Sequence, residues 1–260
     1  MSVRSSVRSV IRYRWLLYEL VKRDVLLRYR GSYLGFAWTL LNPIIFMLIY
    51  TLVFSVYLKS GLHAFPLYLL SGMIPWFWLS SAVAQSVTAI LDGRAYVGKT
   101  LMPTEILILV PVLSNGVNFL ITISLLFILT IALGVPFGWA LLFLPILALI
   151  ELAMTLGFSF FVATANVFYR DLQQLINYAL LAAFFLTPIF YARFIVPPNL
   201  QFLIKFSPIA ALVSGYQNVF YYGVPPGWRE LTFAAVSAVV ILFLSILYFN
   251  RHRDEFIAYV

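Results

Sequence analysis

Long apolar runs separated by short polar segments dominate the chain. Six of these runs have the length of a membrane-spanning helix, which needs about 20 predominantly apolar residues. They cover residues 38–58, 66–90, 104–133, 139–164, 173–192 and 229–249. The third and fourth runs are the clearest, because no charged residue occurs from Ile106 to Ile150 and the sequence GVPFG turns the chain between them. The pattern therefore predicts an all-α integral membrane protein with six transmembrane helices.

One further apolar stretch, residues 195–227, does not fit the pattern of complete spans. Lys205 and the Ser207-Pro208 step divide it into pieces too short to cross a bilayer. Open backbone cannot face lipid, so such pieces need shielding by protein or contact with water. We expect re-entrant helices over about 195–222, before the last span. The alternative is an ordinary loop that lies on the outer surface.

Composition supports a membrane protein and excludes several classes of site. The chain is 63% hydrophobic and 10% charged, whereas a soluble domain carries about 25% charged residues. It contains no cysteine, which excludes a disulfide framework and a thiolate metal site. We expect no metal site of another kind and no bound cofactor.

The positive charge is unevenly placed, and its placement predicts the topology. Eight of the 17 Lys and Arg residues precede the first apolar run. A basic segment beside a span meets anionic lipid headgroups and orients the protein. With the N-terminus inside, the inner segments hold 13 Lys and Arg residues and the outer segments hold four. Both termini are therefore expected in the cytoplasm.

The segment before the first span reads as an imperfectly amphipathic helix at the cytoplasmic interface. Glu19, Lys22, Arg23 and Arg30 share one arc of such a helix, whereas the i,i+4 pair Asp24 and Arg28 interrupts another face. We expect residues 1–37 to form a basic arm with this interface helix, and residues 38–260 to form the transmembrane domain. Asn42-Pro43 reads as the N-cap and first position of a new helix.

The sequence GRAYVGKT, residues 93–100, matches the phosphate-binding loop pattern G-x-x-x-x-G-K-[ST]. A working loop follows a buried strand and opens a helix. Here an apolar span precedes the motif, and Pro103 follows closely, which favours a new helix start. We interpret the match as a coincidence. The polar loop around Arg94, Tyr96 and Lys99 either docks a cytosolic partner or merely connects two spans.

A carboxylate lies near the middle of the fourth predicted span. Glu151 is costly at this depth, so it is expected to face the protein interior and to have a partner. Asn115 and Asn118 lie at a similar depth on the preceding span. We predict that Glu151 pairs with one of them, Asn118 being our choice, and joins the two helices.

Aromatic side chains gather at two places. Trp76, Phe77 and Trp78 lie deep within the second predicted span, away from the headgroup level where aromatic belts occur. They either pack the helix bundle or line a conduit in which sugar rings stack on their faces. The same two alternatives apply near the outer side to Tyr216, Phe220 and Tyr221.

Four sequence blocks carry a family resemblance. They are RDVLLRYRGSYLGFAWTLLNP (23–43), FPLYLLSGMIPWFWLSS (65–81), ANVFYRDLQQ (165–174) and TPIFY (187–191). These blocks resemble the permease subunit of type-2 ABC exporters, in particular the branch that exports O-antigen and related polysaccharides. The resemblance runs in order from about residue 22 to residue 255.

The resemblance implies a homodimeric six-span permease of the bacterial inner membrane that works with a separate ABC ATPase, which binds the ATP. The implied cargo is a polysaccharide on polyprenyl pyrophosphate, as in lipopolysaccharide biosynthesis. Arg94, Tyr96 and Lys99 become an ATPase-coupling element. Arg23, Arg28 and Arg30 become candidates for attracting the pyrophosphate, because Arg forks bind phosphate oxygens well. The two aromatic groups become candidates for lining the channel.

Two other interpretations remain open. The cargo of such a permease can be teichoic acid, capsule polysaccharide or a small amphiphile. A membrane enzyme acting on polyprenyl phosphate is the rival of another class, but it needs clustered carboxylates for Mg²⁺. The nine acidic residues are scattered, and their only adjacent pair is Asp254-Glu255 in the C-terminal tail.

Overall fold

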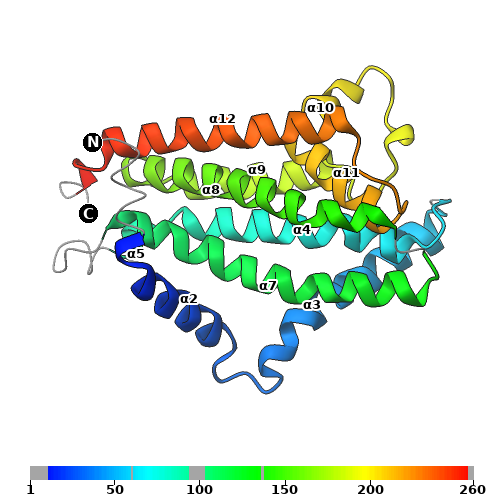
Figure 1. Ribbon diagram of the computed structural model, residues 1–260, viewed down its shortest axis with the longest axis horizontal. Helices are drawn as coiled ribbons and strands as arrows, with labels where there is room; N and C mark the ends of the chain where they lie inside the picture. Colours follow the sequence, from blue (N-terminus) through cyan, green and yellow to red (C-terminus); the bar gives the residue numbers. More distant parts are fainter. Residues whose placement is uncertain (1–10, 60, 94–102, 136–137, 257–260) are drawn as a thin grey trace.

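The computed structural model describes residues 11–59, 61–93, 103–135 and 138–256, and the regular structure within these ranges is helical (Figure 1). The predicted all-α class is thus confirmed. The α-helices are α2 (Arg14–Tyr29), α3 (Trp38–Tyr50), α4 (Phe65–Ser86), α5 (Ala89–Asp92), α7 (Thr104–Ala132), α8 (Leu144–Phe168), α9 (Leu172–Leu186), α10 (Gln201–Lys205), α11 (Pro208–Phe220) and α12 (Trp228–His252). Short 3₁₀ turns are η1 (Gly35–Ala37), η3 (Trp139–Phe143) and η4 (Arg193–Ile195), and the π-helical stretch η2 (Thr51–Tyr57) extends α3.

Five helices in the described ranges are long and apolar enough to cross a membrane. They cover Gly35–Tyr57, Phe65–Ser86, Thr104–Ala132, Trp139–Phe168 and Trp228–His252, and each corresponds to one predicted run. The remaining predicted run, 173–192, contains the 15-residue helix α9. At 1.5 Å per residue α9 is about 22 Å long, less than the hydrocarbon core of about 30 Å. The helix ends at Leu186 because Thr187, which precedes Pro188, takes an extended conformation.

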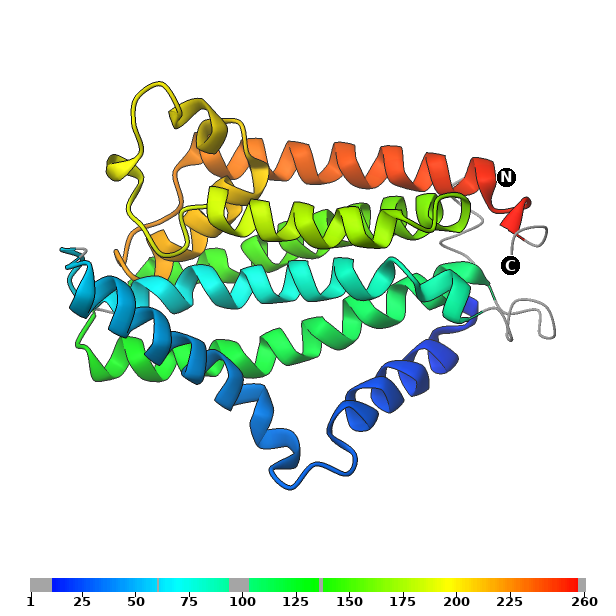
Figure 2. The same ribbon diagram turned by 180° about the vertical axis from the view of Figure 1, so that it is seen from behind.

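Helix α4 occupies the centre of the bundle. In its most apolar window 78% of the residues are buried, against 11% for the first span and 22% for α12. It packs against α7, α8 and α11 (Figures 1 and 2). Residues of α4 therefore contact several other helices at once, and side chains of α4 line both cavities described below.

The most extensive helix–helix contact in the described ranges joins α8 and α12, which run side by side (Figure 1). Gly157 of α8 permits this close approach. A Cβ atom built at Gly157 would lie 2.8 Å from the backbone nitrogen of Leu242. Membrane helices use such small residues because lipid provides little hydrophobic force for helix association, so close backbone packing supplies the attraction.

Helices α2 and α3 form a V that projects from the bundle (Figures 1 and 2). Gly31 and Gly35 adopt φ values of 80° and 49° in the reversal between them, a backbone region that glycine enters without steric cost. The bend agrees with the sequence expectation, but its details do not. Helix α3 begins at Trp38 directly after η1, and Pro43 lies inside it. The predicted helix start at Asn42-Pro43 is therefore wrong, because the η1 turn already starts the helix.

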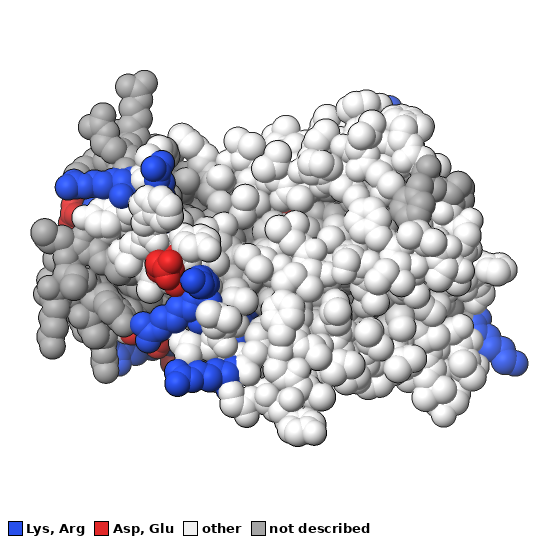
Figure 3. Space-filling view, turned by 60° about the horizontal axis from the view of Figure 1, so that its bottom comes forward, with Lys and Arg blue, Asp and Glu red and all other residues white. Residues whose placement is uncertain are grey.

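Charged side chains gather at one end of the molecule, around α2, α5 and the end of α12 (Figure 3). A broad uncharged surface follows, and a few Lys or Arg side chains appear again at the opposite end. This distribution matches a multi-pass membrane protein, in which charges avoid the hydrocarbon layer.

Candidate functional site

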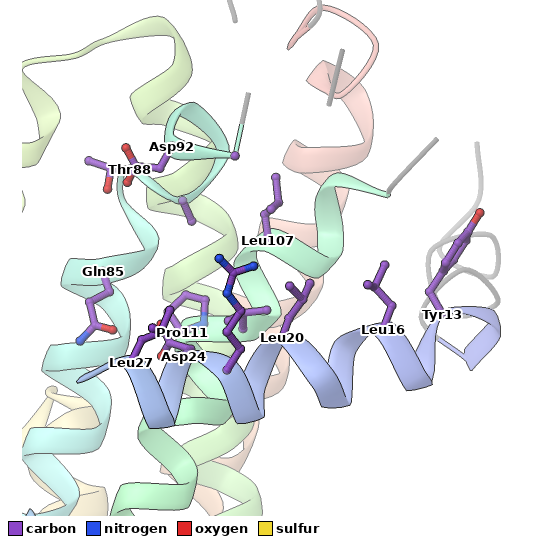
Figure 4. Close-up of a pocket in the computed structure, with 14 residues that line it drawn as sticks. Tyr13, Leu16, Leu20, Asp24, Leu27, Gln85, Thr88, Asp92, Leu107 and Pro111 are labelled. Atoms are coloured by element: carbon purple, nitrogen blue, oxygen red, sulfur yellow. The ribbon is translucent and has the colours of Figure 1, made fainter. Parts of the chain in front are cut away.

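The first cavity, which we call the α2 groove, lies between α2 and the neighbouring ends of α4, α5 and α7. It has a volume of about 770 Å³. Figure 4 shows Leu16 and Leu20 projecting from the same side of α2, the side on which Leu107 of α7 lies. Charges of both signs, from Arg23, Asp24 and Asp92, also line the groove. The groove therefore combines an apolar floor with a charged rim, as a surface for a protein segment does.

Arg28 fastens the last turn of α2 to the bundle. Its Nε and Nη2 atoms donate to Asp24 at 3.0 and 2.7 Å, Nη1 donates to Asn115 of α7 at 2.8 Å, and Nη2 also donates to Gln85 of α4 at 2.7 Å. Asn115 in turn donates to Gln85 and to the Pro111 carbonyl. We call Arg28, Asp24, Gln85 and Asn115 the Arg28 network. Hydrogen bonds to charged groups are the stronger ones, so this network sets the position of α2.

The second cavity, which we call the amide cavity, lies on the other side of the Arg28 network. It has a volume of about 470 Å³, and its walls come from the end of α2 and from α3, α4 and α7. Side-chain amides and hydroxyls alternate there with aromatic rings. The lining includes Tyr29, Asn42, Phe77, Trp78, Asn115 and Asn118.

The three neighbouring aromatic residues of α4 separate into two environments. Trp76 is buried beside Phe184, with ring centroids 5.8 Å apart. Trp78 is buried on the other side, where it stacks on Phe119 at 4.7 Å and donates through Nε1 to the Val112 carbonyl at 3.0 Å. Phe77 is partly exposed and lines the amide cavity. A role in lining a channel therefore stays a prediction, and within this chain Trp76 and Trp78 pack between helices.

The aromatic residues of the second predicted group are also mostly internal. Tyr216 and Phe220 of α11 are fully buried, and Phe220 packs edge-on against Phe127. Tyr221 is partly exposed, and its hydroxyl donates to the His63 carbonyl at 2.7 Å. In this conformation Tyr216 and Phe220 contact neighbouring helices and do not face an open conduit.

Glu151 does face the protein interior, but its partner differs from the predicted one. The Tyr216 hydroxyl donates to Glu151 at 2.6 Å, and the second carboxylate oxygen has no partner in the described part of the chain. Asn118 instead accepts a long bond of 3.5 Å from Tyr29. The Glu151–Asn118 pair is therefore corrected to Glu151–Tyr216. The reason is that α11 inserts between the spans and brings a hydroxyl closer than α7 brings its amide.

The three arginines proposed for phosphate differ in their surroundings. The guanidinium of Arg28 is hydrogen-bonded within the Arg28 network. Arg23 and Arg30 are exposed and border a surface hollow of about 610 Å³ next to Gly35 and Phe36. Attraction of a pyrophosphate by these residues stays a prediction. Arg94, Tyr96, Lys99 and the GRAYVGKT motif after its first glycine lie outside the described residues.

The sequence did not predict the long-range side-chain hydrogen bonds that hold the helix ends together. Arg253 donates to Glu105 at 3.0 Å, and this carboxylate is 1% exposed at the start of α7. Arg193 donates to Glu230 and, at 2.6 Å, to Ser214. Each link joins residues far apart in the chain, and a single sequence carries no signal for such pairs. The sequence predicts only the local pair Asp24–Arg28, from its i,i+4 spacing.

Comparison with known proteins adds independent information. The family model described as ABC-2 type transporter matches residues 16–221. The O-antigen export system permease protein RfbA of Myxococcus xanthus is 34% identical over 252 residues, which cover 96% of this chain and 97% of that protein. RfbA of Klebsiella pneumoniae is 26% identical, with 93% of both chains covered. The polysialic acid transport protein KpsM of Escherichia coli is 24% identical, with 91% of this chain and 92% of KpsM covered.

Proposed function

This chain belongs to the ABC-2 type transporter family, and from this premise we propose that it is the permease of a polysaccharide exporter in the bacterial inner membrane. The proposed cargo is an O-antigen type glycan linked to polyprenyl pyrophosphate, as in lipopolysaccharide biosynthesis. The observation that carries this proposal is the end-to-end similarity to permeases named for O-antigen export. Family membership implies an ABC ATPase as partner.

We propose that the ATPase binds at the α2 groove and at the loop that begins after Gly93. The groove has an apolar floor and charges of both signs, and it lies at the charged end of the molecule. In the sequence, Arg94, Tyr96 and Lys99 come one, three and six residues after Gly93, which itself lines the groove. ATP would be bound by the partner alone, and this chain would hold no cofactor and no ATPase site of its own.

The proposed assembly contains two copies of this chain. Two observations support it. The first span is only 11% buried in its apolar window, and α9 has no buried residue. Both helices thus present apolar surface that lipid or a second copy must cover. A homodimer would place the main path for polysaccharide between the copies.

The proposed topology keeps six crossings with both ends in the cytoplasm. Helix α9 would supply the sixth crossing together with the chain that follows it. Helix α11, with 13 residues, is about 20 Å long and mostly buried among α4, α8 and α12. A short helix shielded in this way satisfies the condition for re-entry into a membrane. The count of Lys and Arg residues supports the orientation.

Reversing the charges at Arg94 and Lys99 tests the coupling. The variant Arg94→Glu with Lys99→Glu should insert into the membrane at the normal level and export at least about tenfold less glycan, because the contact with the ATPase changes sign. Export is measured as surface glycan, and insertion as the amount of permease in washed membranes. Lys59→Glu with Lys205→Glu is the matched control on the opposite side. Normal export by the Arg94 and Lys99 variant would refute the coupling role.

Deletion of the gene tests the cargo. Glycan that disappears from the surface and accumulates on its lipid carrier inside the cell would support export of that glycan. Loss without accumulation would favour an enzyme of assembly. The similarity to the polysialic acid transport protein KpsM favours a polysaccharide of that kind as the second candidate cargo, and an unchanged O-antigen with a loss of surface polysialic acid would select it.

A further inference from the structure

The amide cavity offers several polar groups that have no partner in the described structure. The amide of Asn42, on α3, makes no hydrogen bond to a described residue. The amide nitrogen of Asn118, on α7, donates no bond to any described atom, and its oxygen accepts only the long bond from Tyr29. The Ser81 hydroxyl, on α4, is also free of a partner in these ranges. Asn118 and Ser81 are partly buried and Asn42 is exposed, and polar groups inside a membrane protein are costly when unpaired, so a ligand or water can complete them.

Aromatic rings form the other part of the wall. Phe46 and Phe77 lie with ring centroids 5.5 Å apart, and Trp78 stacks on Phe119 at 4.7 Å. All four rings line the cavity. Aromatic faces provide apolar contact area, and the neighbouring amides fix the orientation of a bound molecule. The cavity volume of about 470 Å³ lies in the range of roughly 300–1,000 Å³ that is typical of small-molecule sites.

The charge balance excludes a simple anion site. Arg28 is the only Lys or Arg residue among the described residues that line the cavity. Its guanidinium is already paired with Asp24 and bonded to Asn115 and Gln85. Little positive charge therefore remains for a phosphate, and the free groups are neutral donors and acceptors. Neutral amides and hydroxyls beside aromatic rings suit a molecule with hydroxyl groups on one edge and C–H groups on its face.

We propose that the amide cavity binds one neutral sugar unit within a single chain, between α2, α3, α4 and α7. Asn42 and Asn118 hydrogen-bond to its hydroxyl groups, and Trp78 and Phe77 contact its C–H face. The proposal deepens the proposed function and rests on it for the identity of the sugar as part of the cargo. Tyr29 lies at the end of α2 and donates to Asn118, so an occupied cavity also contacts the helix that borders the α2 groove.

Binding of methyl glycosides to the full-length permease tests the site. The permease is placed in lipid nanodiscs, and saturation-transfer NMR measures binding of the methyl glycosides of glucose, galactose, mannose and rhamnose, with inorganic pyrophosphate as the charged probe. At least one glycoside should bind, and pyrophosphate should not displace it. Asn118→Leu and Asn42→Leu should each weaken that binding about tenfold or more, because each removes hydrogen bonds while keeping a similar volume.

Asn199→Leu is the matched control, because it makes the same change at an exposed position between η4 and α10. It should bind the glycoside like the unchanged protein. Size-exclusion profiles show whether each variant is folded, and Asn42→Leu, which changes an exposed side chain, serves if Asn118→Leu does not fold. The absence of glycoside binding, equal binding by both cavity variants, or binding of pyrophosphate alone would overturn the proposal. Export without an ATPase would refute the proposed function and leave glycoside binding unaffected.

Discussion

At the scale of single residues, the buried polar groups need partners within the protein, because hydrocarbon offers no water to satisfy them. Glu151 and Tyr216 illustrate this. Both side chains are fully buried, and their bond joins α8 to α11. Removing one partner leaves the other without compensation, and this costs more than the bond itself contributes on balance.

Tyr216→Phe should therefore lower the free energy of unfolding by about 1–3 kcal/mol, the cost of leaving a buried polar group unsatisfied. Glu151→Gln should cost less, since its amide oxygen still accepts the bond from Tyr216. Thermal unfolding of the purified permease in detergent measures both. Tyr222→Phe is the control, because Tyr222 is 53% exposed. An unchanged melting temperature for Tyr216→Phe would show that the bond contributes nothing.

Gly157 allows the close contact between α8 and α12 because it has no side chain. Gly157→Ala should destabilise the fold by about 1–3 kcal/mol, the usual cost of overpacking, because the added Cβ meets the backbone of Leu242 at 2.8 Å. Gly138→Ala is the matched control, since the nearest atom there lies at an ordinary 3.6 Å. The two variants are compared by thermal unfolding in the same detergent, and equal stability would mean that the helices adjust without cost.

At the scale of elements, α2 is the helix most dependent on a few contacts. Leu17 is its only buried residue, so the Arg28 network supplies much of what holds it to the bundle. Arg28→Met keeps the length of the side chain and removes the four bonds. Backbone amides of α2 should then exchange with deuterium about tenfold faster or more, because about 1.4 kcal/mol of local stability corresponds to a factor of ten.

Arg23→Met is the matched control for this exchange measurement, since Arg23 lies on the same helix and bonds to no described residue. Its α2 amides should keep their protection. If Arg28→Met and Arg23→Met exchange alike, the network does not hold α2. The result bears directly on coupling, because the groove beside α2 is the proposed seat of the ATPase.

The elements also show what the sequence could reveal. The apolar runs predicted the positions of α7 and α8 closely, because hydropathy depends only on the residues of the span itself. The same signal placed the end of α9 too far along, at 192, since Pro188 ends the helix inside a run that stays apolar. Partners such as Tyr216 for Glu151 depend on how α11 inserts between the spans. That arrangement is a property of three-dimensional packing, which residue spacing does not encode.

At the scale of the whole molecule, the absence of cysteine makes the predicted orientation directly measurable. Leu200→Cys, between η4 and α10, should react with a membrane-impermeant maleimide in intact spheroplasts. Arg251→Cys, at the end of α12, should react only after permeabilisation. Both positions are exposed, so reactivity reports the side of the membrane. The reverse pattern would invert the topology drawn from the count of Lys and Arg residues.

The burial of α4 has a consequence for how exporters of this kind diversify. A changed side chain on α4 must suit α7, α8 and α11 at once, whereas one on α3 meets mostly surface. Sequence change should therefore accumulate slowly along the central helix and quickly along the peripheral ones. New surface contacts would then arise on the peripheral helices, at positions whose neighbours impose few demands.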